Sequence, residues 1–287
     1  MSATTILVCD EQGIGDAIIF SSVLNELIEK AGHVIIDVDY RLVDWFQRSF
    51  PKATVHRHVT VRSNGRPHRH YHWLKDEKLP RPDYHIQSGS LFARFRPTLD
   101  SFDDPIAHLK PDPERVAFWK ARFDALGPGP KVGLCWSGGY VTPVRAKGYM
   151  SLSDMEPLWD LADKGAIFID CMYKDASEDR AQLEAEKGVK VHDWDDIDRR
   201  LELDEAAAYT AALDYVISIS SSPVAIGAAQ GLPTATMLHK ADRLFFGTGK
   251  ELWFEKSDLF IAENQADWPH GPLARARKRA GEVLFGE

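Results

Sequence analysis

The 287-residue sequence predicts an α/β fold of two Rossmann-like halves that face each other across a cleft. Short, all-apolar, β-branched runs such as TTILVC (4–9) and DYVISIS (214–220) are typical of strands buried on both faces of a parallel sheet. Segments with apolar residues at helical spacing alternate with these runs. The breaker GPGP at 127–130 interrupts this alternation, which then starts again. The sequence therefore predicts two successive α/β halves.

In the first half, helices end where glycine or proline stops the periodic pattern, at Gly32 and before Pro51. The expected strands are 4–9, 33–39, 53–59 and 83–89, and the expected helices are 17–31, 41–50 and 113–126. Residues 60–82, rich in His and Arg, are expected to be irregular.

In the second half, the same alternation predicts strands at 131–138, 166–173, 190–194, 214–220 and 234–238, with 234–238 as the last core strand. Helices are expected at 151–164, 175–187, 204–213 and 222–231. The predicted domains are 1–128 and 129–265, and a final helix within 266–287 is expected to pack back on the first. Ligands of such sheets lie at the carboxyl ends of the strands, so the cleft is the expected site.

Composition and net charge exclude several classes of protein function and location. A net charge of −8 argues against a globally basic nucleic-acid binder, although a local basic patch is compatible with it. The three cysteines lie in apolar runs without a C-x-x-C pair, as expected of reduced thiols in a cytosolic protein. The N-terminus lacks the basic region of a signal peptide, and no apolar stretch is long enough to span a bilayer. We expect a cytoplasmic protein without a transmembrane segment.

The loop EQGIGDA (11–17) follows the first expected strand. Gly13 and Gly15 would allow a tight turn and close approach to a ligand. Asp16 has two interpretations, an N-cap of the next helix or a carboxylate presented as a general base. The dinucleotide fingerprint G-x-G-x-x-G is incomplete, because Phe20 and Ser21 occupy the region of its third glycine. This disfavours a nicotinamide enzyme.

Three motifs in order, EQGIGDAIIFSSVLNEL, VGLCWSGG and DYVISISSSPVAIGAAQGLPTATML, resemble the heptosyltransferase-like glycosyltransferases of family 9 and related domains that follow helical repeats in bacterial proteins. The middle of the chain, 56–110, does not share in the resemblance. The resemblance implies the GT-B fold and inverting transfer of a hexosyl, heptosyl or pentosyl group from a nucleotide-diphosphate sugar. It implies no metal and no cofactor beyond this co-substrate.

In family terms Asp16 would deprotonate the acceptor hydroxyl. The donor's diphosphate would lie against backbone N–H groups of the loop after the second half's first strand, and a downstream basic residue would assist. The side chain beside the base could be Tyr173 or Met172, with core packing as the alternative. The candidate donor-site residues are Gly13, Gly15, Trp136, Ser137, Gly138, Arg145, Lys147, Tyr173, Ser220, Ser221, Ser222 and His239. For Arg145 and Lys147 the alternative is solvated loop charge, and for His239 a strand cap.

The serine run before 222–231 could bind diphosphate, or it could be an N-cap followed by Pro223 at the first helical position. The family commonly has Asp-Thr-Ser here and a His a few residues on. This chain has Ser220 in place of the Asp and Ala225 in place of the His. The departure is compatible with a degenerate site that binds without catalysis.

The segment VHRHVTVRSNGRPHRHYHWLK (55–75) is locally basic. Arg66, Arg69 and His70 are candidate contacts for an anionic acceptor, such as a phosphorylated glycan or nucleic acid, and the alternative is a solvated loop. Alternating histidines could share one face and hold a metal, but no Cys or carboxylate cluster accompanies them, so we expect no metal site. DVD (37–39) is interpreted as a strand-end turn, and DWDDID (193–198) as a solvated loop or helix start.

The sequence thus predicts an inverting, metal-independent glycosyltransferase. Two alternatives remain: a nucleotide- or glycan-binding module that has lost turnover, and a sugar-nucleotide epimerase on the same scaffold.

Overall fold

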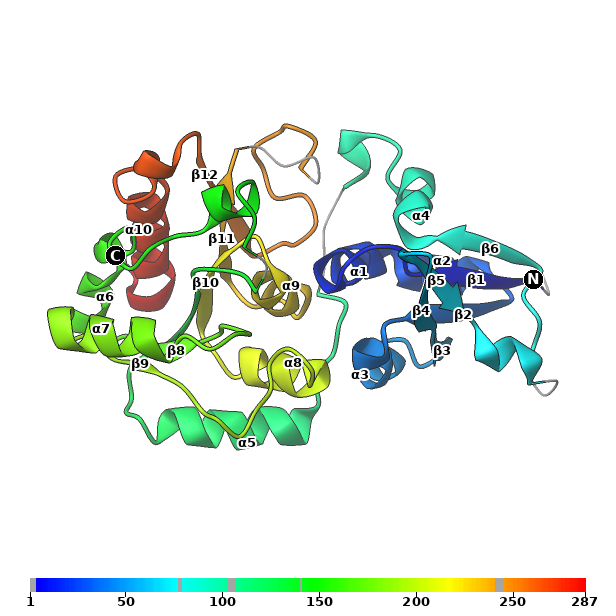
Figure 1. The fold of residues 1–287 in the computed structure, drawn as a ribbon, viewed down its shortest axis with the longest axis horizontal. Helices are drawn as coiled ribbons and strands as arrows, with labels where there is room; N and C mark the ends of the chain where they lie inside the picture. The colour runs from blue at the N-terminus through cyan, green and yellow to red at the C-terminus, as the bar shows by residue number, and fades with distance from the viewer. Residues whose placement is uncertain (1–3, 77–78, 103–106, 140, 241–244) are drawn as a thin grey trace. The chain divides into compact units, whose positions relative to one another are not determined.

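The computed structural model describes residues 4–76, 79–102, 107–139, 141–240 and 245–287 (Figure 1). The chain divides into two compact units, Met1–Lys110 and Pro111–Glu287, so the division falls before the expected boundary at residue 128. The reason is helix α5 (Pro113–Asp124), which packs against α8 (Leu203–Ala211) of the second unit. The breaker GPGP is therefore a turn inside the second unit. That the site lies in a cleft between the halves stays a prediction.

The first unit contains a four-stranded sheet in the order β3-β2-β1-β6, and every neighbouring pair is parallel. The strands are β1 (Thr5–Cys9), β2 (His33–Val38), β3 (Thr54–Arg57) and β6 (Tyr84–Gln87). The helices are α1 (Ile14–Phe20), α2 (Leu24–Lys30), α3 (Val43–Ser49) and α4 (Ser88–Phe95). The expected helix at 17–31 is thus two helices, joined by the 3₁₀ turn η1 (Ser21–Val23), in which the Ser21 hydroxyl donates to the Ile18 carbonyl at 2.7 Å.

Residues 59–70 correct the expectation of an irregular segment. Strands β4 (Val59–Ser63) and β5 (Arg66–His70) form an antiparallel hairpin that is a sheet of its own. Its turn is Asn64-Gly65, with φ of 51° and 74°. Positive φ at both central positions is what a type I′ hairpin turn requires, and Asn-Gly satisfies it. The sequence analysis did not recognise this Asn-Gly turn, because the segment around it is rich in His and Arg.

The second unit contains a six-stranded parallel sheet in the order β12-β11-β10-β7-β8-β9. Its strands are β7 (Lys131–Cys135), β8 (Ile167–Asp170), β9 (Val191–His192), β10 (Tyr215–Ile219), β11 (Thr234–His239) and β12 (Ser257–Ala262). Strand β12 was not expected, because as an edge strand it is only partly buried and SDLFIA begins with polar residues.

The helices of the second unit include α7 (Ser177–Lys187), α9 (Ser222–Ala229) and α10 (Pro272–Phe285). Only α6 (Asp160–Asp163) and a 3₁₀ turn, η6 (Glu156–Leu158), replace the helix expected at 151–164. Before them Asp154 accepts the Ser151 N–H at 2.8 Å, a local turn that competes with helix.

Helix α10 lies within the second unit, whereas the final helix was expected to pack on the first domain (Figure 1). It contacts β10, β11, β12 and η6. Leu273, Ala276 and Ala280 are fully buried there and belong to the main hydrophobic core. None of the described helices combines the length and apolarity needed to cross a bilayer.

A buried ionic network fixes the end of β8. Asp170 has no exposed side-chain surface and pairs with Arg180 of α7. Arg199 donates from Nε to the Met172 carbonyl at 2.7 Å and from Nη2 to Asp193 at 2.7 Å. Arg180 also reaches Asp193 at 2.8 Å, so two arginines balance two carboxylates. The stretch 193–198 is therefore not simply a solvated loop.

We expect Asp170→Asn to lower the free energy of unfolding of the protein by about 3 kcal/mol or more, because it leaves buried arginine charge uncompensated. The matched control is Asp160→Asn, since Asp160 is half exposed where it pairs with Arg277 and should contribute under about 1 kcal/mol. Urea unfolding followed by far-UV circular dichroism measures both. Equal effects of the two substitutions would contradict a structural role for the buried network.

Candidate functional site

The candidate donor residues of the second unit gather at the carboxyl edge of its sheet. The loop Trp136–Gly139 follows β7, Tyr173 follows β8, Ser220–Ser222 follows β10, and His239 ends β11. Parallel strands carry these four chain segments to the same edge. The sequence prediction that they belong together is compatible with this topology.

Gly138 has less space for a side chain than its neighbour Gly139 at this edge. A Cβ atom there would lie 2.6 Å from the Tyr149 hydroxyl and 3.0 Å from the Tyr173 hydroxyl. At the exposed Gly139 the nearest atom to a Cβ would be Tyr173 Cε2, at 3.3 Å. Two tyrosines therefore flank a glycine turn whose backbone can approach a ligand. Met172, by contrast, is buried in the core, so Tyr173 is the one of the two at the loop.

The serine run is arranged differently from a simple cap. Ser221 occupies the N-cap position of α9, with Pro223 in the first turn, but its hydroxyl makes no cap hydrogen bond. It donates instead to the Ile219 carbonyl at 3.2 Å and lies 3.7 Å from the Cys135 sulfur at the end of β7. The hydroxyl thus links β10 to β7, and the first N–H groups of α9 are left without a side-chain cap from Ser221.

Two cations lie near His239. Arg145 and Lys147 are exposed on the 3₁₀ helix η5 (Arg145–Gly148), which packs against β11. A Cβ on Gly148 would be 3.9 Å from the His239 Cβ. Burial first, and then the neighbouring Lys240 and Lys147 charges, lower the pKa of His239. The electrostatic environment at this point of the edge therefore favours an anion.

In the first unit, the sequence expectation for Asp16 is modified. Helix α1 begins at Ile14 and its N-cap is Gly13, so Asp16 stands at the third helical position and Gly15 inside the first turn. One carboxylate oxygen of Asp16 accepts the Gly13 N–H at 3.2 Å. The side chain is half-buried, so it closes the helix start while remaining partly accessible. Both interpretations of this residue remain compatible with the geometry.

A polar cluster at the carboxyl ends of β1 and β2 was not predicted. Asp10 is 4% exposed and Asp37 is 1% exposed, and His58 Nδ1 lies 2.8 Å from Asp37 Oδ2. Asp37 is therefore a buried hydrogen-bond partner of His58 rather than part of a strand-end turn. Asp39 does form such a turn, accepting the Arg41 N–H at 3.0 Å. The sequence did contain one indication of this polar cluster, because Asp10 directly follows the apolar run that forms β1.

A small cavity of about 10 Å³ adjoins this cluster. Asp10, Asp37 and Ser88 line it, and Oδ1 of each aspartate and the Ser88 hydroxyl have no hydrogen-bond partner among the described residues. A cavity of this size with three polar partners accommodates about one water molecule. Within the described part of the chain, no group of three His, Cys, Asp or Glu side chains is arranged to hold a metal ion.

Burial raises the pKa of Asp10 from 3.8 to about 6, against the opposing charges of Arg69 and His58. Between pH 4 and 6 the folded state keeps a proton that the unfolded state releases. Stability should therefore fall as the pH rises through this window, by up to about 3 kcal/mol.

Asp10→Asn should remove this contribution and make the dependence less steep, and at pH 7 the variant should be more stable than the parent. Asp170 and Glu251, whose pKa values burial raises to about 6 and about 7, add slopes of the same sign to both proteins. Chemical unfolding at half-unit pH steps measures it, with the exposed Asp44→Asn as a control that keeps the parental slope. A parental slope in Asp10→Asn would assign the dependence to another group.

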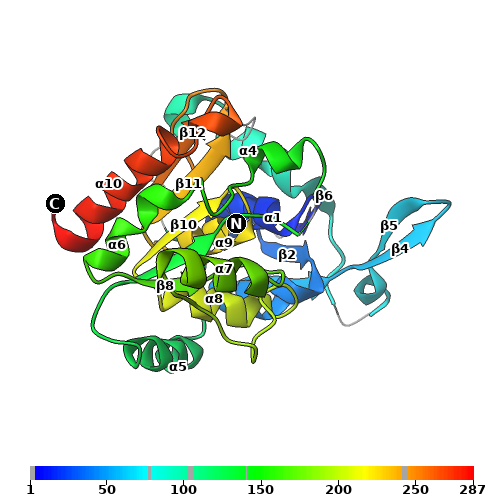
Figure 2. The ribbon, with the colours of Figure 1, turned by 60° about the vertical axis from the view of Figure 1, so that its left-hand side comes forward.

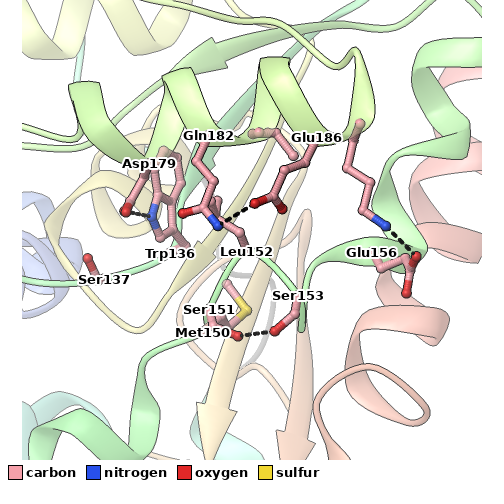
Figure 3. A pocket seen from close by; sticks show the side chains of 12 residues that line it. Trp136, Ser137, Met150, Ser151, Leu152, Ser153, Glu156, Asp179, Gln182 and Glu186 are labelled. Atoms are coloured by element: carbon pink, nitrogen blue, oxygen red, sulfur yellow. Dashed lines mark hydrogen bonds and ion pairs between the residues drawn. The ribbon is translucent and has the colours of Figure 1, made fainter.

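A separate pocket of about 570 Å³ lies between α7 and the segment 150–153 (Figure 3). Asp179, Gln182 and Glu186 line it from one face of α7, and Asp179 accepts the Trp136 indole N–H at 2.8 Å. The Trp136 side chain is thus buried and engaged on this side. Three carboxylates and one lysine among the lining residues disfavour a diphosphate, so the pocket is not assigned as the donor site.

Comparison with known proteins gives the class of fold. No family model matches the chain. The crystal structure of a family 9 glycosyl transferase from Veillonella parvula is similar over 100% of this chain and 99% of its own, with a TM-score of 0.64 and 14% identity. Heptosyltransferase II of E. coli, described as an ADP-heptose LPS enzyme, gives 0.64 and 13% over 99% of both chains. The fold is therefore that of the GT-B glycosyltransferases, as the sequence predicted.

Two further likenesses complete the comparison. E. coli heptosyltransferase WaaC, solved with ADP-2-deoxy-2-fluoro heptose, matches with a TM-score of 0.57 and 12% identity over 97% of this chain and 99% of its own. In sequence, the chain is 33% identical to Protein FlbA of Caulobacter vibrioides over 266 residues. These matched residues make up 92% of this chain. The chain spans 44% of the length of that relative.

Proposed function

We propose that this protein is an inverting, metal-independent glycosyltransferase that moves a sugar from a nucleotide-diphosphate donor to an acceptor hydroxyl. The observation that carries the proposal is the convergence of a glycine turn, the serine run and two cations at one sheet edge. The heptosyltransferase fold, seen in a WaaC structure with an ADP-sugar analogue, supports it.

In this reaction the acceptor oxygen bonds to the anomeric carbon as the bond from that carbon to the diphosphate breaks. Asp16 takes the acceptor proton, which requires a carboxylate within hydrogen-bond reach of the hydroxyl. The departing diphosphate gains negative charge, and backbone N–H groups of the Gly138 turn and of the α9 start are donors suited to it. Arg145 and Lys147 supply positive charge that a divalent cation would otherwise provide.

For the acceptor we propose an anionic group bound near Arg69. In the hairpin register Thr60 opposes Arg69, whereas Val59 opposes His70 and Ser63 opposes Arg66. Directly opposed residues share a face and successive residues alternate, so Arg69 lies on one face and Arg66 and His70 on the other. Arg69 is the half-buried one, and its charge acts on Asp10 and Asp37. The three predicted acceptor residues therefore do not form one contact surface.

A catalytically silent binding module is the second candidate. The observation that favours it is Ser220, which is exposed at the position where the resembling family has an aspartate. Such a protein would bind a donor nucleotide and release it unchanged.

A thermal-shift screen against nucleoside diphosphates and nucleotide sugars tests donor binding, since a ligand at 100 times its Kd stabilises the fold by about 2.7 kcal/mol. With the donor found, Asp16→Asn should reduce transfer at least 10³-fold and leave donor binding unchanged. The asparagine oxygen can still accept the Gly13 N–H, so the helix start is kept. Turnover unaffected by this change would exclude Asp16 as the base, and donor binding without parental turnover would favour the silent module.

Gly138→Ala should weaken binding of the same nucleotide at least tenfold, because the added methyl group forces Tyr149 and Tyr173 away from the turn. Gly139→Ala is the matched control, with more space around its Cβ, and should stay within about threefold. Isothermal titration of each variant gives the affinities. Parental affinity in Gly138→Ala would place the nucleotide elsewhere.

A further inference from the structure

The outer edge of the β4–β5 hairpin, formed by β4, has no part in the proposed sugar transfer, which uses only Arg69 of β5. The hairpin extends away from β2 of its own unit, as Figure 2 shows, and every residue of β4 is exposed. The following segment anchors its base: Tyr71 and Trp73 pack on Leu7, Cys9 and Ile35, and Trp73 stacks on His56 at 4.6 Å. The hairpin is therefore held at its base and presented outward.

The charge of the segment is opposite to that of the remaining chain. Residues 57–75 contain four arginines and one lysine and no Asp or Glu. Because the whole chain carries −8 and this segment carries +5, the remainder carries −13. Among the described residues no ion pair joins Arg62 or Arg66 to a carboxylate. The hairpin is thus a place where an acidic partner would be attracted to a protein of net negative charge.

The two edges of the hairpin differ in their capacity to pair. In a two-residue hairpin the residues that flank the turn, Ser63 and Arg66, are a hydrogen-bonded pair. The next pair out is Arg62 with Pro67, so the backbone groups of both point outward, and Thr60 with Arg69 repeats this. Pro67 has no N–H, which weakens the β5 edge. On β4, Thr60 and Arg62 present complete backbone groups.

The side chains along β4 alternate in the same way. Val59 and Val61, 40% and 44% exposed, lie on one face, and Thr60 and Arg62 lie on the other. A strand added at this edge would place apolar residues beside the valines and acidic residues beside Arg62. It would also turn a marginal two-stranded ribbon into a three-stranded sheet.

We propose that the β4 edge docks an acidic, extended polypeptide segment by strand addition. Polypeptide is favoured over nucleic acid, because a sugar-phosphate backbone neither continues the strand ladder of β4 nor packs against its exposed valines. The larger aromatic rings beside the hairpin, Tyr71 and Trp73, are engaged in packing, which leaves only the imidazoles of His68, His70 and His72 for base stacking. The docking does not involve the donor edge of the second unit.

The test uses the whole chain and a fluorescein-labelled octapeptide of alternating glutamate and valine, measured by fluorescence anisotropy. Saturable binding below 1 mM is expected, and at least tenfold weaker binding of the matching lysine–valine octapeptide. Thr60→Pro removes one outward N–H at a position equivalent to Pro67, so the hairpin's own hydrogen bonds are kept. It should weaken binding at least tenfold, whereas Thr60→Ala should stay within twofold.

Arg62→Glu should also weaken binding at least tenfold, with the exposed Arg81→Glu as the control that stays within twofold. The melting temperature of each variant verifies folding, and Arg62→Glu keeps the test valid if Thr60→Pro perturbs the hairpin. The proposal is overturned by absence of binding, by equal binding of Thr60→Pro and Thr60→Ala, or by equal binding of both peptides. Tighter, Arg62-dependent binding of a ten-residue oligothymidine would overturn it in favour of nucleic acid.

Discussion

The carboxylate of Asp170 is the constraint on which the candidate donor edge depends. It lies at the end of β8 with no exposed surface, where an isolated charge would be prohibitively costly. Arg180 from α7 and Arg199 from the loop before α8 are drawn to it, and Asp193 completes the balance. Because Arg199 also binds the Met172 carbonyl, the same network sets the course of the chain into Tyr173 and hence the walls around Gly138.

Each unit thus buries an aspartate near the carboxyl end of a parallel strand, but the two are neutralised differently. Asp170 is paired with guanidinium groups, which stay charged at any pH of interest. Asp37 is hydrogen-bonded to the imidazole of His58, and burial raises the pKa of Asp10 beside them to about 6. Burial also raises the pKa of Asp170 to about 6 and that of Glu251 to about 7, so each unit contains carboxyl groups whose charge responds to mild acid. In the first unit, Asp16 lies one loop away from Asp10.

Charge is also segregated along the chain. The remainder of the chain carries a net charge of −13, while the hairpin concentrates uncompensated positive charge on an exposed pair of strands. Its inner residue Arg69 acts on the buried aspartates, and its outer edge carries valines and unpaired backbone groups. One short hairpin therefore has side chains in two environments, because successive residues of a strand point to opposite faces.

The sequence by itself determined the two parallel sheets and the class of fold, because apolar β-branched runs followed by amphipathic segments leave little choice of topology. It also pointed to the glycine turn and the serine run, since strand ends are visible as breaks in hydrophobic periodicity. Only the tertiary structure decided which polar residues are partners. Asp37 with His58, Asp170 with Arg199, and Gly138 against Tyr149 join positions on different elements, and no local pattern encodes such contacts. The edge strand β12 and the hairpin were missed for a related reason: partly exposed strands lack the apolar signal that burial imposes on the central ones.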